Sequence, residues 1–276
     1  MASKIEPYKG IAAIYDEIRP SYPQKLIDDV IAKTGIKLSS RLLEIGPGTG
    51  KATIQFAEKG YSIHGVELGE DMATILRYKC RQYENVTVDV APFEKWTNKD
   101  SDGYDMIYCA QAFHWLDPKL KYEKCHELLK NDGYLVLFWY NSSDGNSPIA
   151  KERQTEIAKI VNKYVSKASV KDDNSQRREH DGVYKEDERL KEIESSGLFT
   201  LVEKIEYLQE TKNSAEEYLK VMKSVPAFMS LLDGIDDMSI SYMNNDIKEV
   251  INKYGGCVTS FLNFSLYITR KVKPIS

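Results

Sequence analysis

This chain contains few of the residues that stabilise small secreted proteins. It has four cysteines, and no two of them form a CxxC pair: Cys80, Cys109, Cys125 and Cys257. Cysteines scattered in this way argue against a disulfide framework and are typical of reduced thiols in a reducing compartment. Histidines are also scarce, and His64, His126 and His180 do not cluster with acids or cysteines at the spacing of metal ligands. The sequence therefore predicts neither disulfides nor a bound metal.

The sequence also lacks long apolar runs and a surplus of charge of one sign. No segment approaches the roughly 18 unbroken apolar residues that a membrane span needs. The first residues, MASKIEPYKG, lack the apolar centre of a signal peptide. The formal net charge is -4 and both signs are interspersed, so no basic field invites nucleic acid or an anionic membrane surface. We therefore expect a cytoplasmic protein whose partner is a small molecule.

Short apolar runs alternate with helical segments along the first half of the chain. We expect strands at residues 41–46, 61–67, 86–90, 104–110 and 133–140, with helical segments between most of them. These runs are almost continuously apolar, as strands buried on both faces of a parallel sheet are. Strands that alternate with helices form right-handed βαβ units. The sequence thus predicts an α/β fold with a doubly wound, mainly parallel sheet.

The pattern loosens after residue 140. A helix is expected at 149–167, a strand at 199–209, two helical stretches within 215–254, and a final strand from residue 257 to 272. The segment 171–188 is too charged for a core, so it is either a solvated connection or a segment that closes over a bound substrate.

The stretch RLLEIGPGTGKATIQFAEKG places Gly46, Gly48 and Gly50 at every second position between a strand and a helix. A nicotinamide-binding turn, G-x-G-x-x-G, would have its third glycine one residue later, where this chain has Lys51. An acid, Glu44, ends the strand two residues before Gly46. Its carboxylate would repel a pyrophosphate but would help to organise a site for an ammonium group. These features argue against NAD and for an adenosine cofactor that carries an amino acid.

LLEIGPGTG resembles the first motif, E/D-x-G-x-G-x-G, of class I S-adenosylmethionine-dependent methyltransferases. The resemblance implies S-adenosylmethionine as cofactor and a Rossmann-like, doubly wound sheet of seven strands. It also implies cofactor contacts from one run of residues: Glu44, Gly46, Pro47, Gly48 and Gly50. The alternative is that the glycines only make a tight turn between strand and helix.

The ends of the second and third strands supply further candidates. Glu67 lies about twenty residues after the glycine turn, where an acid accepts hydrogen bonds from a ribose diol, and Leu68 follows it. Glu67 has an alternative role as a cap for the next helix. In related methyltransferases the turn after the third strand borders the adenine, so Phe93 is expected to contact the base, although core packing explains it almost as well.

Two more stretches resemble the methyltransferase group that includes trans-aconitate methyltransferase. CAQAFHWLDP matches a Q-A/S-x-x-W-type loop, which implies that Ala110 and Gln111 lie beside the cofactor. The same loop places three residues on the acceptor side: Phe113, His114 and Trp115.

YDEIRPSYP matches Y-D-x-x-R-P-x-Y-P ahead of the fold. It implies Tyr15 and Arg19 as cofactor contacts and Tyr22 as an acceptor-side residue. The alternative is a helix start that Pro20 and Pro23 anchor.

The resemblance implies one methyltransferase domain over residues 1–276. Within it we expect an N-terminal helical segment over the cofactor at 1–35, a cofactor-binding core at 36–140, and helical insertions forming an acceptor-side cap at 141–188 and 211–254.

The expected activity is transfer of a methyl group to a small acceptor, for which a carboxylic acid is one candidate, by in-line displacement. His114 is the candidate general base; its alternative role is a pocket wall. A non-catalytic S-adenosylmethionine-binding protein and, less favoured, an NAD-dependent oxidoreductase are the competing functions.

Overall fold

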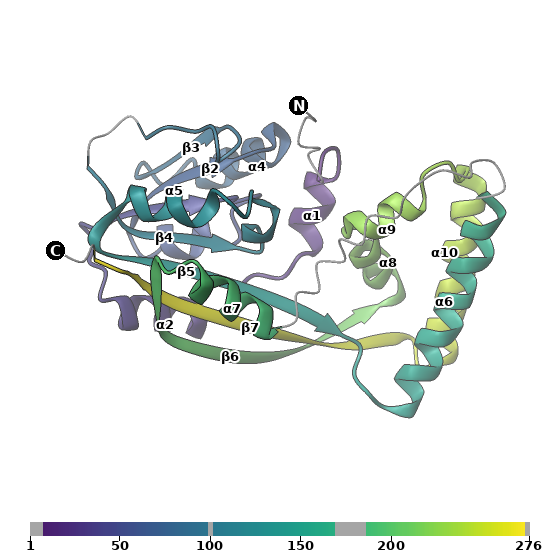
Figure 1. Ribbon diagram of the computed structural model, residues 1–276. Helices are drawn as coiled ribbons and strands as arrows, with labels where there is room; N and C mark the ends of the chain where they lie inside the picture. Colours follow the sequence, from purple (N-terminus) through teal and green to yellow (C-terminus); the bar gives the residue numbers. More distant parts are fainter. Residues whose placement is uncertain (1–7, 99–101, 169–185, 274–276) are drawn as a thin grey trace.

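A seven-stranded sheet forms the centre of the molecule (Figure 1). The computed structural model describes residues 8–98, 102–168 and 186–273. The strand order is β3-β2-β1-β4-β5-β7-β6. The strands are β1 (Arg41–Ile45), β2 (Ser62–Glu67), β3 (Val86–Val90), β4 (Tyr104–Ala110), β5 (Leu129–Ser143), β6 (Phe199–Ser214) and β7 (Cys257–Lys271). The first five run parallel, while β7 runs antiparallel to both β5 and β6. This arrangement confirms the predicted doubly wound, mainly parallel sheet.

Helices cover both faces of this sheet because successive strand residues point to opposite sides. On one face Leu42 packs with residues of α2 (Gln24–Thr34) and α3 (Thr53–Ala57). On the other face Leu43 packs with residues of α5 (Lys121–Leu128) and α7 (Glu186–Ser195). Both leucines are at most 1% exposed, which explains why the strands are apolar throughout.

Helix boundaries differ from the expected ones where residues expected in a helix form turns instead. The helix after the glycine turn is only α3, because residues 50–52 and 58–60 on either side form turns. The helical segment expected between the fourth and fifth strands is α5, which begins at Lys121, and β5 extends at both ends beyond the predicted strand. Three helices rather than two fall within residues 215–254.

The strands β5, β6 and β7 are longer than the other four, and a second group of helices is attached at their far end. These helices are α6 (Pro148–Ala168), α8 (Ala215–Lys223), α9 (Pro226–Leu231) and α10 (Asp237–Lys253). They enclose their own apolar cluster around Met243, Ile247 and Ile251, each 0% exposed. Figure 1 shows α6 and α10 side by side at the end of these strands; we call the group α6, α8, α9 and α10 the cap. Most of the charged segment expected at 171–188 lies outside the described residues.

Candidate functional site

The glycine turn lies where β1 meets β4, with its backbone in a conformation that side chains disfavour. Gly46, Gly48 and Gly50 have φ angles of +64°, +57° and +87°, in the left-handed region that glycine adopts without steric cost. A Cβ on Gly46 would lie 2.6 Å from the Cβ of Ala112, so the turn and the loop after β4 are in close contact. A Cβ on Gly48 would meet nothing within 4 Å, so the space above that residue is open.

Glu67 faces this turn from the end of β2. Its Oε2 accepts a hydrogen bond from the Gly48 amide at 2.8 Å, and its Oε1 accepts one from the Gly69 amide at 2.9 Å. Burial raises the pKa of the carboxyl above its ordinary value, while the backbone amides oppose the rise. Because a carboxylate offers about four acceptor positions, two amides leave capacity for the hydroxyls of a ligand. Leu68 follows, half-buried.

The loop after β4 contributes a strained residue. Gln111 has a φ of +61°, and it is the single non-glycine residue with positive φ among the described residues. Its amide N–H donates to the Phe138 carbonyl and its Nε2 donates to the Tyr140 carbonyl at 2.9 Å. Strained backbone held in place by such contacts is concentrated at functional sites. These bonds fix the loop against the carboxyl end of β5, with Ala110 half-buried beside it.

His114 and Trp115 continue this loop in the short 3-10 helix η1 (Phe113–Trp115). His114 is half-buried, and its ring lies 4.9 Å from that of Trp115, which is 40% exposed. Both residues follow Gln111 closely on the loop that leaves the carboxyl end of β4.

An N-terminal helix, α1 (Ala12–Ile18), packs against α4 (Glu70–Cys80) beside the glycine turn (Figure 1). The Lys79 Nζ lies 2.6 Å from the Asp16 carboxylate, and the Lys51 Nζ donates to the Asp16 carbonyl at 2.7 Å. The Gly10 amide donates to the Asp71 carboxylate at 2.8 Å. These contacts hold α1 next to the glycine turn.

Arg19, just after α1, joins three parts of the molecule. Its Nη1 donates to the Tyr140 hydroxyl at 3.0 Å, and its Nη2 donates to the Ser224 carbonyl at the end of α8 at 2.8 Å. Its guanidinium also lies 5.4 Å from the Tyr15 ring. The N-terminal segment, the sheet and the cap thus meet at one guanidinium.

Tyr8 and Tyr140 are site residues that the sequence did not single out. The ring of Tyr8 lies 5.0 Å from that of Tyr15, edge to face. Its hydroxyl is close to Arg19, Tyr140 and Glu67, and burial raises its pKa. For Tyr140 the sequence offered one indication of a site residue, its place at the carboxyl end of a predicted strand. For Tyr8 it offered none.

The Glu44 side chain lies in the core beneath the glycine turn, not in the open space beside Gly48. The side chain is 1% exposed, and its Oε2 accepts hydrogen bonds from the Thr53 hydroxyl at 2.6 Å and the Tyr108 hydroxyl at 2.8 Å. Its Oε1 is buried without a hydrogen-bond partner among the described residues. Burial raises the pKa of this carboxyl to about 7. Pro47, in the turn itself, is buried as well.

Three aromatic residues expected at the site lie in the core. Tyr22 is 7% exposed and packs edge to face on Phe138, with ring centroids 4.7 Å apart. Phe93 and Phe113 are 4% and 1% exposed within the cluster that includes α5. All three therefore contribute to the core, as the alternative reading of Phe93 has it, and their contacts with a cofactor or acceptor stay predictions.

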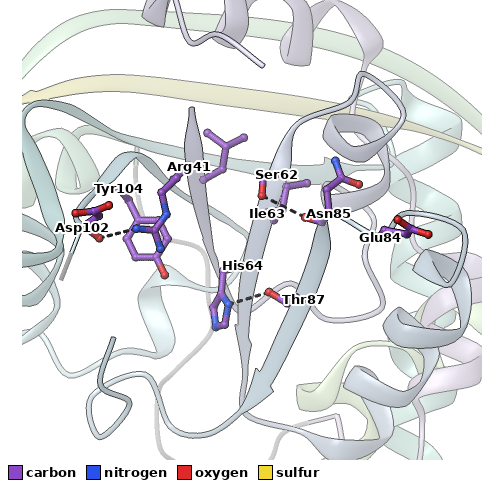
Figure 2. A pocket seen from close by; sticks show the side chains of 10 residues that line it. Arg41, Ser62, Ile63, His64, Glu84, Asn85, Thr87, Asp102 and Tyr104 are labelled. Atoms are coloured by element: carbon purple, nitrogen blue, oxygen red, sulfur yellow. Dashed lines mark hydrogen bonds between the residues drawn. The ribbon is translucent and has the colours of Figure 1, made fainter. Parts of the chain in front are cut away.

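A separate polar hollow of about 670 Å³ lies at the opposite edge of the sheet (Figure 2). Its walls come from the amino ends of β1, β2, β3 and β4. There the Arg41 Nη1 donates to the Asp102 carbonyl at 2.9 Å, and the Nδ1 of His64 lies 2.9 Å from the Thr87 hydroxyl. Ligands of open parallel sheets bind outside the carboxyl ends of the strands. The candidate site is therefore the other edge, with Glu67, Gln111 and the glycine turn.

Within the ranges that the structure describes, no three His, Cys, Asp or Glu side chains are grouped so as to hold a metal ion. No helix in the same ranges is both long and apolar enough to cross a membrane.

Comparison with known proteins agrees with this geometry. Residues 43–137 match the model of a methyltransferase domain. The chain is 28% identical over 172 residues to an uncharacterized methyltransferase-like protein of Schizosaccharomyces pombe, covering 59% of this chain and 62% of the relative. It is 26% identical over 133 residues to a probable S-adenosylmethionine-dependent methyltransferase of Saccharomyces cerevisiae, covering 47% of this chain and 45% of that protein. Each match thus spans less than two thirds of the relative's own length.

Solved structures resemble this chain in fold over most of its length, although their sequence identity to it is low. A putative type II methyltransferase from Anaeromyxobacter dehalogenans superposes with a TM-score of 0.56 at 16% identity, covering 91% of this chain and 97% of that one. Residues 43–137 thus match a methyltransferase domain, and the seven-stranded sheet that contains them shares its fold with solved methyltransferase structures.

Proposed function

We propose that this protein binds S-adenosylmethionine at the carboxyl ends of β1, β2 and β4 and transfers its methyl group to a small-molecule acceptor. The observation that carries the proposal is the position of Glu67, whose carboxylate contacts the amide of Gly48 beneath an open space. The strained Gln111 borders the same edge from β4. The net charge of -4 and the interspersed charges favour a small acceptor over nucleic acid.

The residues present fit such a cofactor. The open space above Gly48 admits a ligand close to the backbone, and Glu67 retains acceptor capacity for a ribose diol. Tyr8, Tyr15 and Arg19 would cover the site from the N-terminal side. Glu44 would support the turn from below through its bond to Thr53. The bound cofactor supplies a methyl carbon that its sulfonium leaving group already activates.

The chain's own contribution to transfer is orientation. Holding an acceptor in line with the methyl group removes entropy costs that are worth about 7 to 11 kcal/mol. Gln111, His114, Trp115 and the Arg19–Tyr140 pair surround the side on which an acceptor would enter. A carboxylate acceptor arrives ionised and needs no base, whereas an amine or phenol needs its proton removed. In this proposal His114 orients the acceptor and serves as base only for the second class.

The test has two independent measurements. Calorimetric titration with S-adenosylhomocysteine measures cofactor binding, and an assay with methyl-labelled S-adenosylmethionine measures transfer to a panel of small carboxylic acids, phenols and amines. Saturable binding together with labelled product supports the proposal, and a base-labile labelled product identifies a methyl ester. Binding without transfer to any member of the panel favours the non-catalytic function, and absence of binding refutes the cofactor assignment.

A further inference from the structure

Arg153, in the second turn of α6, lies buried in the cap with unused donors. The residue is 5% exposed, and its Nε and Nη2 have no hydrogen-bond partner within the described part of the chain. The nearest carboxylate oxygen, Oδ2 of Asp144, is 3.8 Å from Nη2, beyond hydrogen-bonding distance. A guanidinium keeps its charge at any physiological pH, so burial without acceptors is unfavourable. A ligand that supplied acceptors would relieve this cost.

The two unused N–H groups lie on the same edge of the guanidinium. Nε and Nη2 point side by side, and this pair of parallel donors matches the two oxygens of a carboxylate or phosphoryl group. Asp144 is occupied elsewhere, because its Oδ1 accepts from the Ser260 hydroxyl at 3.0 Å and its carboxylate interacts with the Tyr218 hydroxyl. The edge of Arg153 therefore has an ion-pair partner at 3.8 Å but no hydrogen-bond acceptor among the described residues.

A mostly apolar hollow of about 270 Å³ lies between α6, α8 and α9. Ile157 and Val161 of α6, Met222 of α8 and Phe228 of α9 line it. Arg153 is not part of the lining, which begins at its neighbour Gln154. Tyr218 belongs both to this lining and to the interaction with Asp144, so it connects the hollow with the surroundings of the guanidinium.

The end of β5 connects the proposed transfer site with the surroundings of Arg153. Tyr140 lies in β5, which ends at Ser143, and Asp144 follows directly. Four residues of extended chain span at most about 14 Å, so Tyr140 and Asp144 are close along the backbone. Arg19 contacts Tyr140, and it also contacts Ser224 at the end of α8, the helix that carries Tyr218 and Met222.

We propose that the Nε–Nη2 edge of Arg153 is an oxyanion-binding subsite in the cap, and that it anchors the far end of an acceptor with an apolar body and a carboxylate or phosphoryl head. The role as part of the acceptor site rests on the proposed methyl transfer. Binding of the oxyanion itself does not depend on it.

The test measures equilibrium binding of octanoate, octyl phosphate and neutral octanamide by calorimetry, with S-adenosylhomocysteine present. Variants are Arg153→Met, which keeps the length but removes the charge, and Arg153→Lys, which keeps the charge but loses the paired donors. Arg77→Met removes an exposed arginine on α4 and serves as the matched control. A third variant, Asp144→Asn, removes the one carboxylate beside the edge.

We expect octanoate or octyl phosphate to bind at least tenfold more tightly than octanamide. Arg153→Met should abolish that preference, Arg153→Lys should reduce it, and Asp144→Asn should increase it because the repulsion of the ligand is lost. The tighter of the two anions identifies the head group. Equal binding of octanoate, octyl phosphate and octanamide, or unchanged binding of both anions in Arg153→Met, overturns the inference.

S-adenosylhomocysteine affinity reports on the cofactor site in every variant, so failure of the subsite is distinguishable from failure of the proposed function. If Arg153→Met does not fold, Arg153→Lys and Asp144→Asn still decide the question. An oxyanion site requires that the first change lowers the preference for the anions over octanamide and that the second raises it.

Discussion

The burial of Glu44 predicts a specific dependence of stability on pH. Its carboxyl has an ordinary pKa of 4.5, which burial raises to about 7 in the folded protein. A carboxyl that holds its proton more strongly in the folded state stabilises that state at low pH. The stabilisation is complete below pH 4.5 and is lost as the pH rises through about 7.

The magnitude follows from the linkage between proton binding and folding. Between pH 4.5 and about 7 the folded protein retains this proton while the unfolded chain has lost it. The free energy of unfolding then falls by about 1.4 kcal/mol for each pH unit, or about 3 kcal/mol in all. Glu44→Gln is neutral at every pH and keeps an oxygen that can accept from the Thr53 and Tyr108 hydroxyls. The variant should therefore lose this contribution to the pH dependence.

The assay is urea unfolding, followed by tryptophan fluorescence, of the wild type and Glu44→Gln between pH 4.5 and 8.5. The difference in free energy of unfolding, variant minus wild type, should rise by about 3 kcal/mol across the range and then level off. The matched control Glu58→Gln removes the same charge from an exposed position on the following turn. Parallel curves for the wild type and Glu44→Gln would refute the reasoning, because they would show that Glu44 takes up its proton equally in both states.

Three further predictions concern the site directly. Glu67→Ala should weaken S-adenosylhomocysteine binding about tenfold to a hundredfold, since charge-assisted hydrogen bonds contribute about 1.5 to 3 kcal/mol each; the exposed Glu70→Ala is the calorimetric control, and equal affinities would contradict the ribose role. Gly46→Ala should lower the free energy of unfolding by at least about 1 kcal/mol more than Gly48→Ala, because both have positive φ but only Gly46 has a neighbour at 2.6 Å. Equal losses in urea unfolding would argue against that close approach. With a carboxylate acceptor, His114→Ala should reduce the transfer rate equally at all pH values; loss confined to one limb of the pH profile would assign proton transfer instead.

The sheet was predictable from sequence because parallel strands are buried on both faces and therefore read as unbroken apolar runs. Glu67 was predictable as well, since its position at the end of the second strand defines which edge of the sheet it occupies. The glycine spacing predicted a turn between strand and helix, and the positive φ angles of Gly46, Gly48 and Gly50 agree with it.

Contacts between distant segments were not predictable in the same way. Tyr140 meets Arg19 across 121 positions of the chain, and Arg19 meets Ser224 across 205. Periodicity reports which face of an element is apolar, and it carries no information on which segments meet. The aromatic residues Tyr22, Phe93 and Phe113 fit the motif positions, yet the gain from complete burial placed them in the core.

The long strands β5, β6 and β7 have a mechanical consequence. Each is 15 or 16 residues long, and paired residues join β6 to β7 along almost their whole length. A pair of strands hydrogen-bonded in this way resists bending. The cap is therefore attached to the sheet rigidly rather than through a hinge. We therefore expect product to leave by displacement of the short α1 segment, which polar contacts of Arg19 and Glu17 join to the cap, while the wall that carries Arg153 stays in place.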